Sequence, residues 1–538
     1  MTGDPQLRFP RQEEIPPAFL QHPVHLAEYL VDGTLHRWEG PVQEVRSPVC
    51  VRTETGVERY ALGTFPLMTE SAALQALDAA HRAYDSGRGR WPTMPVAERI
   101  GCVQTFAFRM KEERDKVVRL LMWEIGKSLK DAEKEFDRTM DYIDATIDAL
   151  KELDRVSSRF VIAEGIIGQI RRAPLGVTLS MGPFNYPLNE TFTTLIPALV
   201  MGNTVVLKPP RHGVLLFQPL LEAFRDSFPP GVVNTVFGEG RKVIPPLMAT
   251  GKIDVFAFIG SSRAADNLQK VHPSPHRLRL VLGLEAKNPA IVLPDADLDQ
   301  AVHECIAGCL SFNGQRCTAI KIIFVHETVA EAFLERLSRE IAALRCGMPW
   351  EEWVNITPLP EAGKPTYLAD LVADATTLGA RVVNAGGGTV DASFFSPAIV
   401  YPVDARMRLY HEEQFGPVIP VLSFANTAEP IDYIVTSPYG QQVSIFGRES
   451  ESIAKLIDPL VNQVSRVNIN SQCQRGPDIF PFTGRKDSAV GTLSVSDALR
   501  AFSIRTLVAA KESEANKDLI RRIVRERGSA FLSTDFIL

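Results

Sequence analysis

The stretch of sequence that decides the fold is residues 177–208, VTLSMGPFNYPLNETFTTLIPALVMGNTVVLK. It opens with an apolar run, Val177 to Met181, turns helical after Asn189, and returns to an apolar run from Thr204 to Leu207. Short apolar runs on either side of a helical segment are typical of parallel strands joined by a crossover helix. The stretch therefore predicts an α/β fold.

The same alternation continues along the chain. A helical pattern near Leu215 to Phe224 is followed by apolar runs at Val232 to Phe237 and at Val255 to Ile259. Strands and helices in this order predict a doubly wound parallel sheet, the architecture of many dinucleotide-binding domains. A second α/β stretch, from Ile291 to about Leu499, is expected to form a catalytic domain.

The segments around these two stretches have other patterns. Apolar residues recur at helical spacing from Glu70 to Arg155, whereas the residues before Glu70 alternate in short runs that predict small strands. Phe160 to Val177 predicts two strands with a turn at Gly165 to Gly168, and Ser503 to Ala510 predicts another strand. A further helix is expected near Lys517 to Arg527.

Composition excludes several classes of protein. The net charge of the 538-residue chain is only −6 and its cations are interspersed with acids, so we expect neither nucleic acid nor a membrane surface as a partner. The N-terminus lacks the apolar h-region of a signal peptide, and no window reaches 18 uninterrupted apolar residues, so we expect neither secretion nor a membrane span. The seven cysteines are an odd number without C-x-x-C pairs, which predicts free thiols, a reducing cytoplasmic location and no structural metal.

Cys317 lies at the centre of Ser311 to Lys321, SFNGQRCTAIK. Gly314 lets backbone approach a ligand closely, and the neighbouring Arg316 favours a thiolate, so the segment has the surroundings of a nucleophile. An isolated cysteine is more often a buried apolar residue. The segment by itself leaves both interpretations open.

Three motifs together resemble the signature set of the aldehyde dehydrogenase superfamily: F-x-x-G-Q-x-C-T around Cys317, F-N-Y-P at Phe184 to Pro187, and E-E-Q-F-G-P at Glu412 to Pro417. The resemblance covers nearly the whole chain in the same order. It implies an α/β fold with a Rossmann-type cofactor domain, an α/β catalytic domain and a small β oligomerisation arm. We accordingly expect a dinucleotide-binding domain (1–155 and 173–284), a catalytic domain (285–499), oligomerisation strands (156–172 and 500–515) and a C-terminal extension (516–538).

The resemblance also implies roles for the reacting groups. Cys317 would attack an aldehyde, and the side-chain amide of Asn185, with the backbone N–H of the nucleophile, would bind the oxyanion. From the residue alone, Asn185 is equally a turn asparagine before Pro187. Its place just after a predicted strand favours the binding role, because ligands of open α/β sheets bind at that edge.

Six residues are expected at the cofactor. Lys208 ends a predicted strand, and Gly260 and Ser261 open a predicted helix whose N–H groups suit a pyrophosphate. The resemblance assigns Glu413 to the nicotinamide ribose, with Phe415 beside it. NAD-preferring relatives have a glutamate three residues after the lysine. Arg211 stands there in this chain, and a guanidinium pairs well with a 2′-phosphate, so we expect NADP.

The resemblance is closest to the non-phosphorylating, NADP-dependent glyceraldehyde-3-phosphate dehydrogenases. It rests on Q-R-C-T-A-I-K, Q-R-G-P-D-x-F-P-F, N-Y-P-L-N and E-x-x-R-T, in four distant segments. In that family the arginines and the tyrosine of these motifs bind the substrate phosphate. They correspond here to Arg138, Tyr186, Arg316 and Arg475, although each alone is also an ordinary surface or packing residue.

One motif departs from the family. L-E-L-G-G-K, which carries the general-base glutamate, is L-G-L-E-A-K at Leu282 to Lys287, so Gly283 replaces the glutamate and Glu285 replaces a glycine. On an extended strand these two positions share a face, about 6.6 Å apart. Glu285 is therefore a candidate to activate the hydrolytic water, and pairing with Lys287 or another cation is its alternative role.

Together these features predict a cytoplasmic homo-oligomer, dimer or tetramer, that oxidises a phosphorylated aldehyde with NADP. D-glyceraldehyde 3-phosphate is the expected substrate and the free acid the product. Two alternatives follow from the missing base. The first is a CoA-acylating aldehyde dehydrogenase, in which a thiol releases the acyl group. The second is an inactive homologue that binds a dinucleotide.

Overall fold

A six-stranded sheet forms the centre of the computed structural model, which describes residues 9–535. Its strand order is β10-β9-β8-β11-β12-β24. All neighbours are parallel except β12 and β24. The strands are β8 (Val177–Met181), β9 (Thr204–Lys208), β10 (Val233–Thr235), β11 (Val255–Ile259), β12 (Arg279–Gly283) and β24 (Ala489–Val490).

The chain changes direction in this sheet between β8 and β11. It runs outward from β8 through β9 to β10 and then returns to the other side of β8 with β11. Loops that follow β8 and β11 diverge at such a switch point and leave a crevice at the carboxyl edge, where ligands bind. The helices that connect the strands are α6 (Asn189–Val200), η4 (Leu215–Leu220), α7 (Leu221–Ser227), α8 (Gly240–Ala249) and α9 (Ser262–Lys270).

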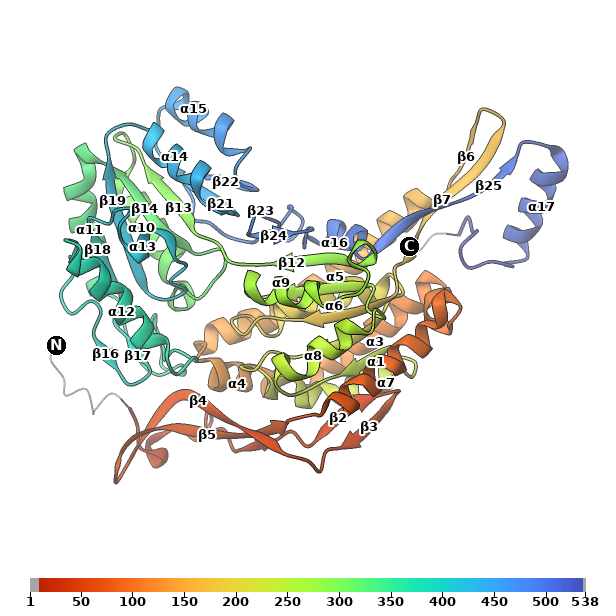
Figure 1. Ribbon diagram of the computed structural model, residues 1–538, viewed down its shortest axis with the longest axis horizontal. Coiled ribbons are helices and arrows are strands. Elements are labelled where there is room, and N and C mark those ends of the chain that lie inside the picture. Colours follow the sequence, from red (N-terminus) through yellow and green to blue (C-terminus); the bar gives the residue numbers. More distant parts are fainter. Residues whose placement is uncertain (1–8, 536–538) are drawn as a thin grey trace.

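A seven-stranded sheet forms the second α/β unit, in the order β15-β18-β19-β14-β13-β21-β22. Figure 1 shows it to one side of the first unit, with β12 leading across. Its strands are β13 (Asn288–Val292), β14 (Ile320–His326), β15 (Arg381–Val382), β18 (Ala398–Tyr401), β19 (Val418–Phe424), β21 (Gln442–Phe446) and β22 (Arg466–Ile469). Its helices are α10 (Leu298–Leu310), α11 (Ala330–Ala342), α12 (Lys364–Thr377), α13 (Arg408–His411), α14 (Ala428–Thr436) and α15 (Ser450–Leu460).

Residues 9–157 form strands and then helices around the central sheet, as the sequence patterns predict. The strands are β1 (Val24–His25), β2 (Glu28–Val31), β3 (Thr34–Arg37), β4 (Val42–Thr53) and β5 (Gly56–Pro66). The helices are α1 (Glu70–Tyr84), α2 (Arg90–Thr93), α3 (Val96–Glu112), α4 (Arg114–Ile125) and α5 (Leu129–Ser157). The apolar stripe of α5, including Phe136, Ile143 and Leu150, is buried in the largest hydrophobic core.

A three-stranded antiparallel sheet projects from the body as an arm (Figure 1). It consists of β6 (Phe160–Ala163), β7 (Ile166–Pro174) and β25 (Ser503–Lys511), with α16 (Val495–Ala501) before it and α17 (Glu514–Arg525) after it. The turn between β6 and β7 lies at Glu164 and Gly165, which have positive φ, so Gly168 belongs to β7 instead of the turn. Gly168 is packed against Leu507, which a longer side chain would displace.

β12 carries the chain from the first sheet towards the second. Residues 282–287 were expected to be extended, but the regular strand ends at Gly283. Ala489 of β24 pairs with Gly283. Glu285 lies in the connecting segment, so the spacing argument for it does not apply. Among the described residues, no helix is both long and apolar enough to span a bilayer.

Candidate active site

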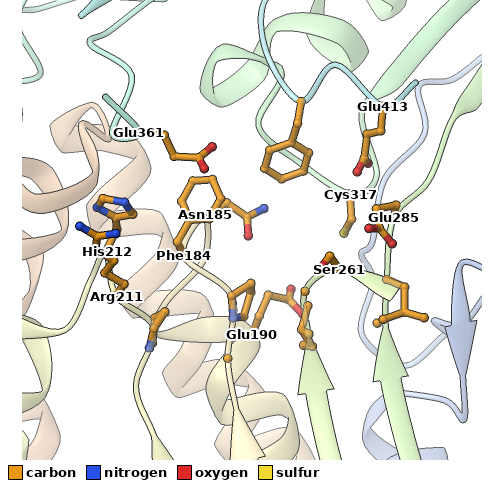
Figure 2. A pocket seen from close by; sticks show the side chains of 18 of the residues that line it. Phe184, Asn185, Glu190, Arg211, His212, Ser261, Glu285, Cys317, Glu361 and Glu413 are labelled. Atoms are coloured by element: carbon orange, nitrogen blue, oxygen red, sulfur yellow. The ribbon is translucent and has the colours of Figure 1, made fainter. Parts of the chain in front are cut away.

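Two cavities meet at Cys317. The first, of about 740 Å³, lies at the carboxyl edge of the six-stranded sheet, between the loops after β8 and β11 and residues of the second unit (Figure 2). The second, of about 330 Å³, is also lined by Cys317 but is bounded by α5 and by the segment around Arg475. The thiol is thus accessible from a crevice of the dinucleotide type on one side and from a smaller polar cavity on the other.

The loop that carries Cys317 has an unusual backbone. Phe312, Asn313 and Gly314 all have positive φ. A Cβ at Gly314 would lie 2.5 Å from the carbonyl oxygen of Cys309, so only glycine fits. After this turn the backbone is fixed at Cys317, because the Cys317 carbonyl accepts hydrogen bonds from Lys321 Nζ at 2.6 Å and Asn288 Nδ2 at 2.8 Å.

The electrostatic surroundings of the Cys317 thiol are mixed. Burial raises its pKa, and the Glu190 carboxylate raises it further, whereas Lys321 and Arg475 lower it. The side chain itself is only partly buried and lines both cavities. A ligand can therefore reach the sulfur, but formation of the thiolate depends on the balance between two cations, Lys321 and Arg475, and two acids, Glu190 and Glu413.

Asn185 lies beside the thiol, on the loop that follows β8. Its Nδ2 donates a hydrogen bond to the carbonyl of Gln315 at 2.8 Å, and its second N–H remains for a ligand in the first cavity. The buried carboxylate of Glu135 fixes the loop by accepting the backbone N–H groups of Leu188 and Asn189 at 3.0 and 3.1 Å. The geometry suits an amide that binds an oxyanion.

Five of the six expected cofactor residues line the first cavity, whereas Lys208, the last residue of β9, is not among its lining residues. The five are Arg211, Gly260, Ser261, Glu413 and Phe415. Lys208 is buried, donates to the carbonyl of Pro209 at 2.8 Å, and has its pKa lowered to about 8 by burial. Glu413 forms an ion pair with Lys321 at 3.0 Å and accepts the Ala286 N–H. Five residues from distant segments are thereby brought to one cavity.

Glu285 also lines the first cavity, where it binds the N-terminus of α9. Its Oε2 accepts the backbone N–H of Ser262 at 2.8 Å. The neighbouring Ser261 caps the same helix by accepting the N–H of Ala264. A carboxylate at a helix N-terminus is stabilised by the unpaired N–H groups and the helix dipole. Figure 2 shows Glu285 close to Ser261.

The four residues expected to bind a phosphate, Arg138, Tyr186, Arg316 and Arg475, all line the second cavity. The guanidinium groups of the three arginines already have protein partners. Arg138 forms two hydrogen bonds with Asp478, at 2.8 and 3.2 Å. Arg316 donates to two carbonyls of α10, and its Nε has no partner among the described residues.

Arg475 is the most deeply buried of these arginines. Its Nη1 pairs with Glu190, its Nε donates to Asp478 at 3.3 Å, and its Nη2 donates to the Leu493 carbonyl at 3.2 Å. A guanidinium has five N–H donors, so Arg475 can contact a ligand only through those that remain. The second cavity therefore holds several cations, but they are partly neutralised.

Sequence reasoning missed Glu190. This residue is 7% exposed and lines both cavities that meet at Cys317. It is the only charged residue of α6, a helix whose twelve residues are all buried. A lone charge in such an apolar helix was the available signal, because a buried carboxylate requires a partner or a function.

Comparisons with known proteins agree with this geometry. Residues 49–508 match the sequence model of the aldehyde dehydrogenase family. The chain is 32% identical over 447 residues to the NADP-dependent glyceraldehyde-3-phosphate dehydrogenase of Streptococcus equinus, covering 82% of this chain and 91% of that protein.

Two solved structures share the fold. The NADP-dependent glyceraldehyde-3-phosphate dehydrogenase of Bacillus halodurans C-125, complexed with NADP, has a TM-score of 0.82 and 30% identity, covering 91% of this chain and 100% of that one. The lactaldehyde dehydrogenase of Escherichia coli has the same TM-score, 27% identity and the same coverage. These findings confirm the predicted fold and the resemblance inferred from the motifs, and the chain belongs to the aldehyde dehydrogenase family.

Proposed function

We propose that this protein oxidises a phosphorylated aldehyde, D-glyceraldehyde 3-phosphate, to the free acid with NADP. The observation that supports this most is the position of Cys317 at the junction of a dinucleotide-type crevice and a cation-lined cavity. A thiol in that position faces a cofactor on one side and the rest of an anionic substrate on the other. The relatives from Streptococcus equinus and Bacillus halodurans, which are named NADP-dependent glyceraldehyde-3-phosphate dehydrogenases, add support.

The residues of the first cavity fit NADP. Arg211 lines the cavity, is exposed and is suited to a 2′-phosphate. The N-terminus of α9 faces the crevice at Ser261, where a pyrophosphate would be favoured. Bound NADP supplies the hydride acceptor of the reaction.

The chain's own groups perform the remaining steps. The Cys317 thiolate adds to the aldehyde carbon. Two donors then stabilise the resulting oxyanion: the free side-chain N–H of Asn185 and the backbone N–H of Cys317. Loss of hydride leaves an acyl group on Cys317 as a thioester. Water then hydrolyses the thioester to release the acid. From the sequence, Glu285 is the candidate base that activates this water.

The second cavity provides recognition of the phosphate. Arg138 and Arg316 retain unused N–H donors after their protein contacts, and Tyr186 adds a hydroxyl. A phosphate dianion competes well for such donors, because each charge-assisted hydrogen bond contributes about 1.5 to 3 kcal/mol. Asp478, which pairs with both Arg138 and Arg475, is the anion with which the phosphate competes.

Substitution of Arg138 tests the phosphate site. For Arg138→Ala we expect KM for D-glyceraldehyde 3-phosphate to rise about 10- to 100-fold, because one charge-assisted contact is lost. KM for D-glyceraldehyde, which has no phosphate, is the internal control and should change less than twofold. Arg336→Ala, at an exposed ion pair with Asp299, is the matched control variant. Equal increases for the two aldehydes would show that Arg138 has only a structural role.

The glycine at position 283 supports one other function. Without a glutamate there, a thiol such as CoA could release the acyl group without an activated water. Product analysis separates the two functions: the proposed enzyme forms the acid at the same rate with or without CoA. An acyl-CoA product, or turnover only with CoA, would assign the acylating activity instead.

Self-association in the cytoplasm is part of the proposal. One face of the arm sheet exposes Val161, Ile170 and Leu507, a stripe that a second copy of the chain would cover. The seven free thiols are consistent with a reducing compartment.

A further inference from the structure

A third, small cavity adjoins the thiol. It has a volume of about 20 Å³ and is lined by Cys317, Glu190 and Gly283, together with Leu282, Leu284 and Gln441. A cavity holds one water molecule when at least about 10 to 15 Å³ is open to its centre. The space beside the sulfur is therefore large enough for one water, with a carboxylate on its wall.

Glycine at position 283 creates part of this space. The three atoms nearest to a Cβ added there would all belong to the side chain of Ile259, at 3.3 Å and beyond, and Gly283 and Cys317 line the same small cavity. The glutamate of the family motif would stand at this position. Its absence removes one carboxylate from the neighbourhood of the thiol, and Glu190 of α6 places another at the same small cavity.

The Glu190 carboxylate is held in place by two neighbours. Arg475 pairs with its Oε2, and Asn189 Nδ2 lies 3.4 Å from its Oε1. The ion pair favours the anionic form of a buried acid and fixes its orientation. Oε1, which has only a long contact, is left to accept a proton. Figure 2 shows the Glu190 and Cys317 side chains directed towards the same open region.

Glu285, the other carboxylate near the thiol, has a different partner. Its Oε2 accepts the Ser262 N–H at the start of α9, and it does not line the small cavity. The hydrogen bond to Ser262 directs the Glu285 carboxylate to the start of α9. Position therefore favours Glu190 over Glu285 as the group that meets a water beside the acylated thiol.

We propose that Glu190 is the general base that activates the water for hydrolysis of the acyl group on Cys317. This rests on the thioester of the proposed function. Oε1 of Glu190 accepts a proton as the water oxygen forms a bond to the acyl carbon. The resulting oxyanion collapses, the C–S bond breaks, and the sulfur leaves as the Cys317 thiolate. The products are the acid and a protonated Glu190, which loses its proton to solvent, and no atom changes oxidation state.

The ester p-nitrophenyl acetate tests this step without NADP or a phosphorylated substrate. It acylates a thiolate and releases p-nitrophenolate, so a rapid-mixing trace gives a burst for acylation and a steady rate for deacylation. For Glu190→Gln we expect a burst of about one equivalent per chain, followed by turnover at least 100-fold slower than that of the wild type. Loss of this carboxylate also removes one cause of the raised Cys317 pKa, so acylation is not slowed.

Two controls separate chemistry from structure. Glu451→Gln, the same substitution at an exposed ion pair with Lys455, should turn over at the wild-type rate. Glu285→Gln is the rival variant, and a stall confined to it would assign the base to Glu285. Hydroxylamine attacks a thioester without a general base and should restore rapid turnover to Glu190→Gln. The burst amplitude reports folding, and Arg475 keeps Asp478 as a counter-ion in the variant.

Three results would overturn the proposal: wild-type turnover in Glu190→Gln, a stall confined to Glu285→Gln, or a Glu190→Gln stall that hydroxylamine does not relieve. The ester arm is independent of the natural substrate. If the wild type forms no NADPH from D-glyceraldehyde 3-phosphate but hydrolyses the ester through Glu190, the proposed substrate fails and the base assignment stands.

Discussion

At the scale of single residues, the distribution of carboxylates around Cys317 distinguishes this chain from the family pattern. Position 283 has no acid, Glu190 faces the thiol from α6, and Glu285 binds the N-terminus of α9. The Glu285 carboxylate therefore accepts a hydrogen bond from the backbone N–H of Ser262, a donor that would otherwise be free for a cofactor pyrophosphate. Negative charge at this place opposes the binding of a second anion.

Removal of that charge should strengthen cofactor binding. For Glu285→Gln we expect the Kd for NADPH, measured by fluorescence titration, to fall about 3- to 10-fold, because an anion near the pyrophosphate is lost and solvent screens the rest. Glu451→Gln, at an exposed i,i+4 pair with Lys455, is the control and should leave Kd unchanged. A weaker or unchanged Kd in Glu285→Gln would show that the carboxylate does not oppose the cofactor.

At the scale of elements, local pattern predicted the strands and helices that carry the site. Residues 177–208 form β8, α6 and β9 as expected, because apolar runs favour buried parallel strands and the segment between them is long enough for a crossover helix. The end of β12 at Gly283 was not predictable. It depends on β24, a strand about 200 residues later that pairs at Ala489.

The arm gives an element whose exposed face can be tested. Leu507 lies opposite Ile170 in the β25–β7 pair, and both are exposed on the same face as Val161. For Leu507→Asp we expect a shift from oligomer to monomer in light scattering after size-exclusion chromatography, because a buried unpaired charge opposes association. Leu519→Asp, on the exposed face of α17, is the control. An unchanged mass for Leu507→Asp would exclude this stripe as the contact.

At the scale of the whole molecule, the site exists because distant segments converge. The Cys317 and Asn185 motifs were recognisable in sequence since each is a compact pattern with its own turn chemistry. The Glu190–Arg475 ion pair joins residues 285 positions apart, and no local pattern reveals such a pair. Its only trace in sequence is an acid inside an apolar helix. For the same reason, the protein partners of Arg138 and Arg475 were not foreseen.

The measurement that tests the account most directly is a single turnover with enzyme in excess over D-glyceraldehyde 3-phosphate, with NADP present. Absorbance at 340 nm follows hydride transfer. We expect one NADPH per aldehyde in the wild type and none in Cys317→Ala, because that variant cannot form the covalent adduct from which hydride leaves. Absence of NADPH in the wild type, or its formation at the same rate in Cys317→Ala, would contradict the assignment of Cys317 as the nucleophile of an aldehyde oxidation.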